Sequence, residues 1–102
     1  MIHPSIQPFI PQMKSLFKKH QIVNAYIFGS GVTGNFNKNS DIDFLVNVKN
    51  DLDPVICGEH LWDLEEELNQ LLNRKIDLIT ERSLKNKYLI SEINQTKELI
   101  YE

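Results

Sequence analysis

The sequence predicts a mixed α/β (α+β) domain, in which helices pack against a mixed β-sheet, because strand-like and helix-like segments alternate along the chain. β-Branched and aromatic residues predict strands at residues 22–28, 41–48 and 75–80, and apolar residues three and four apart predict a long helix at 54–73. With 102 residues and 41% hydrophobic content the chain can enclose one core. We therefore expect residues 1–102 to form a single domain.

The N-terminal half is expected to hold one helix and two strands. After a start that contains several prolines, apolar residues at helical spacing predict a helix that ends near Lys19 or His20; these residues are Phe9, Met13, Leu16 and Phe17. The first strand, IVNAYIF, stops at Gly29, and the second, DIDFLVNV, alternates between two faces. The link between the two strands is short, which predicts that they run antiparallel.

The C-terminal half is expected to hold two helices around a third strand. The helix at 54–73 has a leucine ladder formed by Leu61, Leu64, Leu68, Leu71 and Leu72, which we expect to lie in the core together with Trp62. The margin of the core and a partner interface are the alternatives for Trp62. Its length permits a crossover to the strand KIDLIT at 75–80. From Leu84 onward, Leu89, Ile93 and Ile100 predict a closing helix over residues 84–100.

Composition narrows the classes of function. Eleven Lys and Arg against fourteen Asp and Glu give a net charge of −3, so no broad basic field is available to hold nucleic acid. The single cysteine, Cys57, has no partner for an internal disulfide, and the first residues lack the layout of a signal peptide. The apolar runs are far shorter than the roughly 20 residues that span a bilayer. We expect a soluble, cytoplasmic protein without membrane contact.

Residues 28–46 contain two competing signatures, Gly-x-Gly-x-x-Gly and Asp-x-Asp. Gly29, Gly31 and Gly34 match the dinucleotide-binding pattern, but the residues between Gly34 and the next strand are too few and too rich in Asn for the crossover helix of that fold. The phosphate-binding loop of nucleoside triphosphatases fails as well, because Asn35 and Phe36 stand where Lys and Ser or Thr are required. Neither familiar glycine-rich site fits.

The alternative is a metal-dependent nucleotide site. Asp41 and Asp43, two apart on a strand, project from the same face and can share Mg²⁺, which takes one or two protein carboxylates and completes its shell with substrate phosphates. The small residues of the preceding loop offer backbone N–H groups and hydroxyls to phosphate oxygens; they are Gly29, Ser30, Gly31 and Thr33. Asp77, between Ile76 and Leu78 on the third strand, is the candidate for a third ligand if the two strands are neighbours.

This pattern resembles the DNA polymerase beta nucleotidyltransferase superfamily and, within it, the minimal nucleotidyltransferases. Gly29-Ser30, ten further residues, Asp41-x-Asp43 and the later Asp77 match the family pattern over nearly the whole chain. The resemblance implies a polymerase-beta-like fold in which Asp41 and Asp43 are the principal Mg²⁺ ligands, Asp77 assists the attacking hydroxyl, and Ser30 holds phosphate. It also implies transfer of a nucleotide from a nucleoside triphosphate to a hydroxyl, with release of pyrophosphate.

The same resemblance implies a partner. Family members of this size are often antitoxins encoded beside a HEPN-type toxin, and some adenylylate a tyrosine of that toxin. We therefore expect ATP as the nucleotide and a HEPN-type toxin as the acceptor, with residues 54–73 and 84–100 as contact surfaces and a homo- or hetero-oligomer as the assembly. Many relatives carry arginine just after Gly-Ser, whereas this chain has Gly31-Val32-Thr33; Lys38, Lys75 or Arg82 are the candidates to replace it.

Two alternatives stay open at this point. The chain can be a weakly active or inactive antitoxin that neutralises its partner by occlusion, which the missing arginine favours, or a nucleotidyltransferase that modifies a small molecule. Several residues have simpler interpretations: Ser40 shapes a turn, Glu65, Glu66 and Glu67 form a solvated helix face, and His3, His20 and His60 lack the spacing of zinc ligands and are expected at the surface or in packing.

Overall fold

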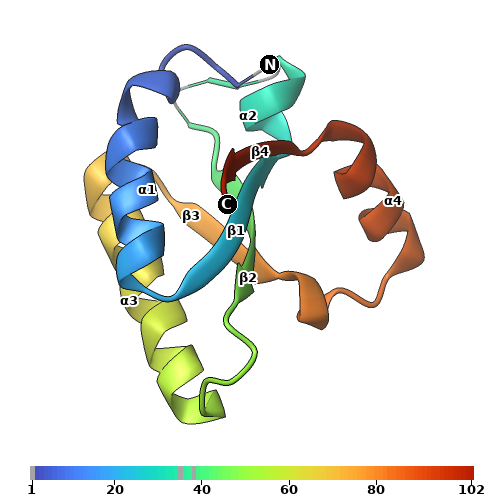
Figure 1. Cartoon of the computed structure of the whole chain (residues 1–102). Coiled ribbons are helices and arrows are strands. Elements are labelled where there is room, and N and C mark those ends of the chain that lie inside the picture. Colours follow the sequence, from blue (N-terminus) through green and yellow to red (C-terminus); the bar gives the residue numbers. More distant parts are fainter. Residues whose placement is uncertain (1, 35, 38) are drawn as a thin grey trace.

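A computed structural model describes residues 2–34, 36–37 and 39–102. The predicted α/β architecture is confirmed: a four-stranded sheet in the order β3-β2-β1-β4 is flanked by helices (Figure 1). The strands are β1 (Ile22–Phe28), β2 (Ile42–Val48), β3 (Ile76–Thr80) and β4 (Glu98–Tyr101). The helices are α1 (Ile10–Lys19), α2 (Ser30–Thr33), α3 (Pro54–Leu72) and α4 (Lys87–Thr96), with short 3-10 turns η1 (Gln7–Phe9) and η2 (Glu81–Ser83).

The strand directions follow from the lengths of the connections. β1 and β2, joined by a short link, pair antiparallel, and β2 and β3, joined by a crossover through α3, pair parallel, as the sequence predicts. The structure adds an antiparallel pairing of β1 with β4. β2 is therefore enclosed between β1 and β3, and β3 is an edge strand of the sheet.

Helices α1 and α3 cover one face of the sheet, and α4 lies on the other side (Figure 1). The alternation of β2 explains this arrangement: Ile42, Phe44 and Val46 are fully buried in the same core cluster as Leu64 and Leu68 of α3. A smaller cluster on the opposite face joins Phe28, Leu45 and Ile93, so α4 packs on the face from which the odd-numbered residues of β2 project. Within the described chain, no helix combines the length and apolar character needed to cross a membrane.

Two expectations from the sequence are wrong. The closing helix does not extend over 84–100: α4 begins at Lys87, where the Asn86 side chain caps it, and Ile100 belongs to strand β4. Pairing with the free edge of β1 overrides the helical spacing of these residues. Trp62 does not join the leucines in the core either, because its side chain is 65% exposed on the outer surface of α3.

Candidate functional site

The sheet register places two of the predicted site carboxylates next to each other. Asp43 of β2 is the direct neighbour of Asp77 on β3, and it is also paired with Phe28 at the end of β1. Residues directly opposite on adjacent strands have side chains on the same face of the sheet. Asp77 is exposed on the edge strand β3, and its side chain lies on the same face of the sheet as that of Asp43.

A pocket of about 340 Å³ lies over this pair, between the sheet and α4. Asp43 and Asp77 contribute from the sheet, Gly29 and Thr33 from the segment after β1, and the α4 wall includes Glu92. Phe28, Ile79 and Ile93 give the pocket an apolar lining. The pocket therefore combines carboxylates, a hydroxyl and apolar surface within one cleft.

Gly29 is required at its position for two reasons. Its φ of 73° lies in the left-handed region that favours glycine, and a Cβ atom there would come within 2.5 Å of Asp43 Oδ2. The chain then forms the single turn α2, which ends at Gly34 with φ 91°. The glycine thus lets the backbone pass directly beside the Asp43 carboxylate.

The other predicted loop residues have different surroundings. Ser30 Oγ donates a hydrogen bond to the Asp41 carbonyl at 3.5 Å, which ties the loop to the start of β2. Gly31 is buried with its Cα facing Ile6 and Ile27, and its carbonyl accepts a hydrogen bond from His3 N–H at 2.8 Å. The backbone N–H groups of Val32 and Thr33 both donate to the Gly29 carbonyl.

The surroundings of Asp43 disfavour the charged form of its carboxyl group. Burial, together with the charges of Asp77 and Asp41, raises the pKa of the Asp43 carboxyl from 3.8 to about 6. Asp41 and Asp77 are therefore both close enough to Asp43 for their charges to affect its ionisation. Such a site holds negative charge that a bound cation would relieve.

Asp41 is oriented toward Lys75 at the start of the same pair of strands. The Asp41 Oδ2 and Lys75 Nζ atoms are 4.0 Å apart, and the two side chains are 47% and 80% exposed. Within residues 2–34, 36–37 and 39–102, no three or more His, Cys, Asp and Glu side chains are placed so that they could hold a metal ion together. The donor set that the structure presents is the pair Asp43 and Asp77, which is the number of protein carboxylates that Mg²⁺ commonly uses.

Comparison with known proteins identifies the family. Residues 11–102 match the family model described as Polymerase beta, Nucleotidyltransferase. The chain belongs to this nucleotidyltransferase family. One relative, from Methanocaldococcus jannaschii and named "Putative protein adenylyltransferase MJ0126", is 35% identical over 88 residues, which are 86% of this chain and 84% of the relative.

Two solved structures share the fold of this nucleotidyltransferase. A toxin-antitoxin structure with AMP-PNP matches with 25% identity and a TM-score of 0.70, over 89% of this chain and 71% of the other. A structure of a tri-AMPylated HEPN toxin of Shewanella oneidensis in complex with an MNT antitoxin matches with 22% identity and a TM-score of 0.64, over 92% and 70%. The resemblance inferred from Gly29-Ser30 and the three aspartates is thereby confirmed at the level of the family.

Arg74 holds the segment that precedes Asp41 in place, a role that the sequence analysis did not predict. Its Nη1 donates hydrogen bonds to the Asn37 and Ser40 carbonyls at 2.8 and 3.2 Å, and its guanidinium lies 4.1 Å from the centre of the Phe36 ring. Ser40 shapes the same turn, as predicted, because its Oγ accepts the Asn37 N–H. Arg74 therefore fixes the segment that leads into Asp41.

Of the three residues proposed to replace the missing arginine, Lys75 and Arg82 lie at different distances from the site. Lys75 lies beside Asp41 at the site end of β3, whereas Arg82 lies in η2, beyond the opposite end of that strand. Lys38 lies outside the described residues. Glu92, on α4, is a further carboxylate of the pocket that the sequence did not single out, since the helical pattern there does not show which face meets the sheet.

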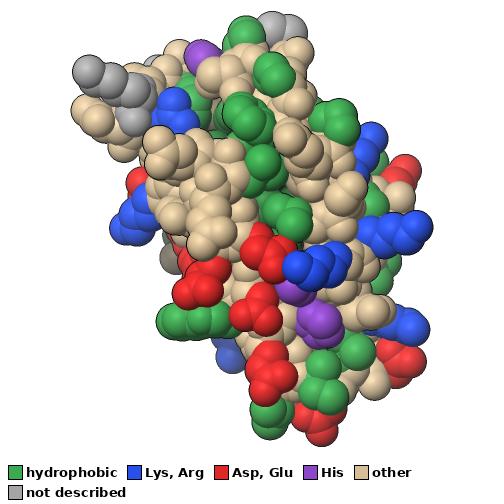
Figure 2. All heavy atoms as spheres, turned by 90° about the vertical axis from the view of Figure 1, so that its left-hand side faces the viewer, with side chains coloured by type: hydrophobic (Ala, Val, Ile, Leu, Met, Phe, Trp, Pro, Cys, Tyr) green, Lys and Arg blue, Asp and Glu red, His purple; other side chains and the backbone are tan. Residues whose placement is uncertain are grey.

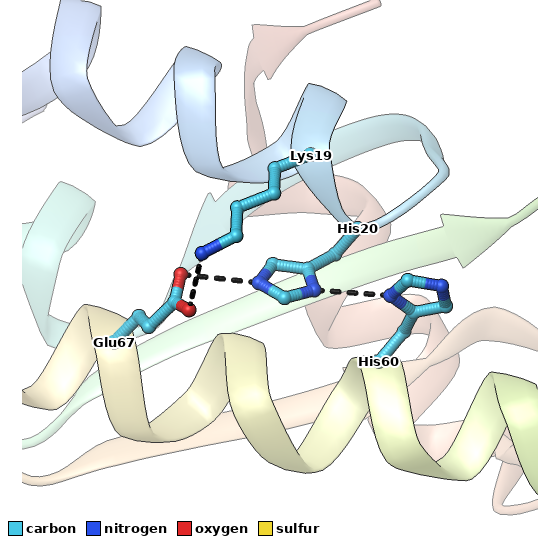
Figure 3. A network of polar contacts seen from close by, with 4 residues as sticks. All are labelled: Lys19, His20, His60 and Glu67. Carbon is cyan, nitrogen blue, oxygen red and sulfur yellow. Dashed lines mark hydrogen bonds and ion pairs between the residues drawn. The ribbon is translucent and has the colours of Figure 1, made fainter.

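A polar network also joins α1 to α3, on the other face of the sheet (Figure 3). His20, which is 4% exposed, donates from Nε2 to Glu67 Oε2 at 3.1 Å, and its Nδ1 lies 3.0 Å from His60 Nδ1. Lys19 Nζ contacts the other Glu67 oxygen at 2.8 Å. Hydrogen bonds from Lys19 and His20 lower the pKa of Glu67. His20 is buried in packing, one of the two positions expected for the histidines. Its contact with His60 could not be predicted from sequence spacing, because helix packing brings the two rings together.

Proposed function

We propose that this nucleotidyltransferase transfers AMP from ATP to a hydroxyl of a partner protein and acts as the antitoxin of a HEPN-type toxin. The observation that carries the catalytic part is the placement of Asp43 directly opposite Asp77, beside Gly29 and within one pocket. The nucleotide and the partner are supported by the names of its relatives: a protein adenylyltransferase, a toxin-antitoxin structure with AMP-PNP, and an MNT antitoxin bound to an AMPylated HEPN toxin.

The residues fit a divalent cation of the kind that nucleotidyltransferases of this fold use, and we propose Mg²⁺. Asp43 and Asp77 would hold it, with Asp41 as a further ligand once its side chain leaves Lys75. The raised pKa of Asp43 is the physical sign of this fit, since a site with uncompensated negative charge favours a cation. When bound, the metal supplies charge neutralisation for the phosphates and a lowered pKa for the attacking hydroxyl.

The chain's own groups have distinct roles in this proposal. Gly29, Ser30, Gly31 and Thr33 form the phosphate side of the site: the glycine lets the backbone approach closely, and the first N–H groups of a helical turn have no partner within the helix. Asp77 lies on the open edge strand, where an incoming hydroxyl can reach it. Phe28, Ile79 and Ile93 place apolar surface beside these groups.

The test is to incubate the purified chain with Mg²⁺, each nucleoside triphosphate and the product of its neighbouring gene, which we propose to be a HEPN-type toxin, and to measure intact masses. We expect the toxin to gain AMP units with ATP, and we expect Asp43→Asn to abolish the gain. Asp51→Asn is the matched control and should retain activity, because this exposed aspartate lies beyond the opposite end of β2 from Asp43.

Each other outcome has a definite meaning. A stable complex without any mass change would replace transfer with neutralisation by occlusion. Transfer to a small hydroxyl compound without any complex would replace the protein acceptor. A mass gain that survives Asp43→Asn would remove the proposed site.

A further inference from the structure

Helix α3 is strongly acidic, because it holds five of the fourteen Asp and Glu residues of the protein. Its sequence holds Glu59, Asp63 and the run Glu65-Glu66-Glu67, and it contains neither Lys nor Arg, whereas the net charge of the whole chain is only −3. Figure 2 shows acidic side chains gathered on the side of the molecule that α1 and α3 form. The helix therefore has an excess of negative charge, whereas the rest of the chain has eleven Lys and Arg against nine Asp and Glu.

Large apolar side chains lie among these carboxylates. Val55 and Trp62 are 70% and 65% exposed, and Ile56 beside them is 47% exposed. Val55, Glu59, Trp62 and Glu66 follow each other at intervals of four, three and four residues, which aligns them along one side of a helix. We name these four residues the α3 stripe.

The α3 stripe points away from the core of the domain. The buried leucines of the helix, Leu64 and Leu68, lie half a turn of the helix away and pack against the sheet. Burial in the domain therefore does not account for an apolar residue such as Trp62 on this side. Exposed apolar groups rimmed by charge are typical of surfaces that bind a partner.

A hollow of about 440 Å³ adjoins Trp62. Glu65, Glu66 and Asn69 line it from α3, and Lys75 and Ile76 line it from the start of edge strand β3. An indole flanked by two carboxylates is an environment that attracts a guanidinium or ammonium group, by cation–π contact and by ion pairing. The α3 wall of the hollow therefore favours a cationic side chain, whereas the exposed Lys75 ammonium group places one positive charge at the β3 wall.

Charge decides between the possible occupants of this surface. A second copy of the chain would bring its own acidic helix against the first, and like charges across an interface are unfavourable. Nucleic acid and anionic membranes carry the same sign of charge as α3 and are disfavoured for the same reason. A basic segment of another protein is the occupant that both the carboxylates and Trp62 favour.

We propose that the α3 stripe and the adjoining hollow are the docking surface for a basic segment of the partner protein, with an Arg or Lys side chain against Trp62 between Glu65 and Glu66. This inference rests on the proposed function for the identity of that partner, the HEPN-type toxin. Lys75 connects the hollow to the site, because it lines the hollow and also contacts Asp41. A partner docked here can present its hydroxyl around the open edge of β3, two residues from Asp77.

The test measures the Kd of the full-length chain for the HEPN-type toxin, by calorimetry at about 0.05 M and about 0.5 M NaCl. Trp62→Ala and Glu66→Lys should each raise the Kd by at least about 10-fold, because truncated aromatic anchors and reversed charges are the costly changes at interfaces. Affinity should fall as salt rises. The matched controls are Leu99→Ala, which removes a 44% exposed apolar side chain from β4, and Glu102→Lys at an exposed position; neither should change the Kd.

A second measurement separates docking from catalysis. At saturating toxin, Trp62→Ala should transfer AMP with an unchanged kcat and a raised KM for the toxin, and ATP should protect the variant from heat as it protects the unsubstituted chain. Toxin binding that is unaffected by Trp62→Ala and Glu66→Lys overturns the docking surface and leaves the proposed function standing. An unsubstituted chain that binds no toxin overturns both.

Discussion

His20 and His60 face each other through their Nδ1 atoms, which are 3.0 Å apart. This separation matches a hydrogen bond, in which one ring donates and the other accepts. A metal ion placed in line between the two nitrogens would need about 4 Å, because each metal–nitrogen bond is about 2 Å long. The two rings are therefore joined by an N–H···N hydrogen bond. Together with Glu67 they connect the end of α1 to the middle of α3.

Removal of the His60 ring should destabilise the fold. His60→Ala leaves the buried Nδ1 of His20 without its partner, which costs about 1–3 kcal/mol of the free energy of unfolding. His60→Asn, whose side-chain amide can reach a similar position, should recover part of this loss. Urea unfolding of the three proteins measures both effects, and equal stability of all three would show that the contact contributes nothing.

The stability of the metal-free protein should decrease as the pH rises through the titration range of Asp43. The folded-state pKa of about 6 lies above the ordinary 3.8, so the folded state binds more protons than the unfolded state between these values, and stability falls as the pH increases across this window. Asp43→Asn should therefore be more stable than the unsubstituted chain at about pH 7, by about 1–3 kcal/mol before screening by solvent reduces the effect.

The difference should vanish below about pH 4, where Asp43 is protonated in both states. Chemical denaturation at the two pH values, with a chelator present, provides the measurement. Greater stability of the unsubstituted chain at neutral pH would mean that burial and the neighbouring carboxylates do not disfavour the charged form of Asp43. The same substitution should eliminate nucleotide transfer, so stability and activity move in opposite directions at this position.

Gly29→Ala should abolish activity while the overall fold is retained. The added methyl group would occupy space 2.5 Å from Asp43 Oδ2, so the carboxylate has to move away from Asp77. Gly34→Ala is the matched control, because Gly34 also has a positive φ, of 91°, and a Cβ atom there meets nothing within 4 Å. Both variants should lose about 1–2 kcal/mol of stability from the left-handed backbone.

Steady-state transfer assays and unfolding curves distinguish the two contributions. Activity that falls equally in both glycine variants would assign the effect to the backbone of the loop and not to the contact with Asp43.

The parts of the fold that the sequence predicted are those that depend on local pattern. The alternation of DIDFLVNV and the leucine spacing of residues 54–72 both reflect burial on one side, and burial of one side is what the core requires. The short link between β1 and β2 and the long one before β3 then determine the strand directions, and the β2–β3 pairing brings Asp77 to Asp43. The topology makes the two strands neighbours, and their register then places Asp43 directly opposite Asp77.

Features that depend on long-range packing were missed. Strand β4 forms because the edge of β1 is available for pairing, which helical spacing in Leu89, Ile93 and Ile100 does not report. The solvent-facing position of Trp62 and the meeting of His20 with His60 are set by the rotation of α3 against α1 and the sheet. A single sequence shows which residues of a helix lie on the same face. It does not show whether an aromatic residue at the border of the buried face is itself buried or exposed.

Arg74 provides the last prediction, because it connects the end of α3 to the entry of β2. Its guanidinium bonds to two carbonyls of the turn before Asp41 and stacks on Phe36, which an ammonium group cannot reproduce. Arg74→Lys should therefore behave nearly as Arg74→Ala: a loss of about 1–2 kcal/mol of stability and a weaker affinity for Mn²⁺, used as a probe of the carboxylate site. Arg82→Ala, in η2, is the control and should change neither quantity. Full Mn²⁺ affinity in Arg74→Ala would mean that Asp41 is positioned by β2 alone, without help from the turn that precedes it.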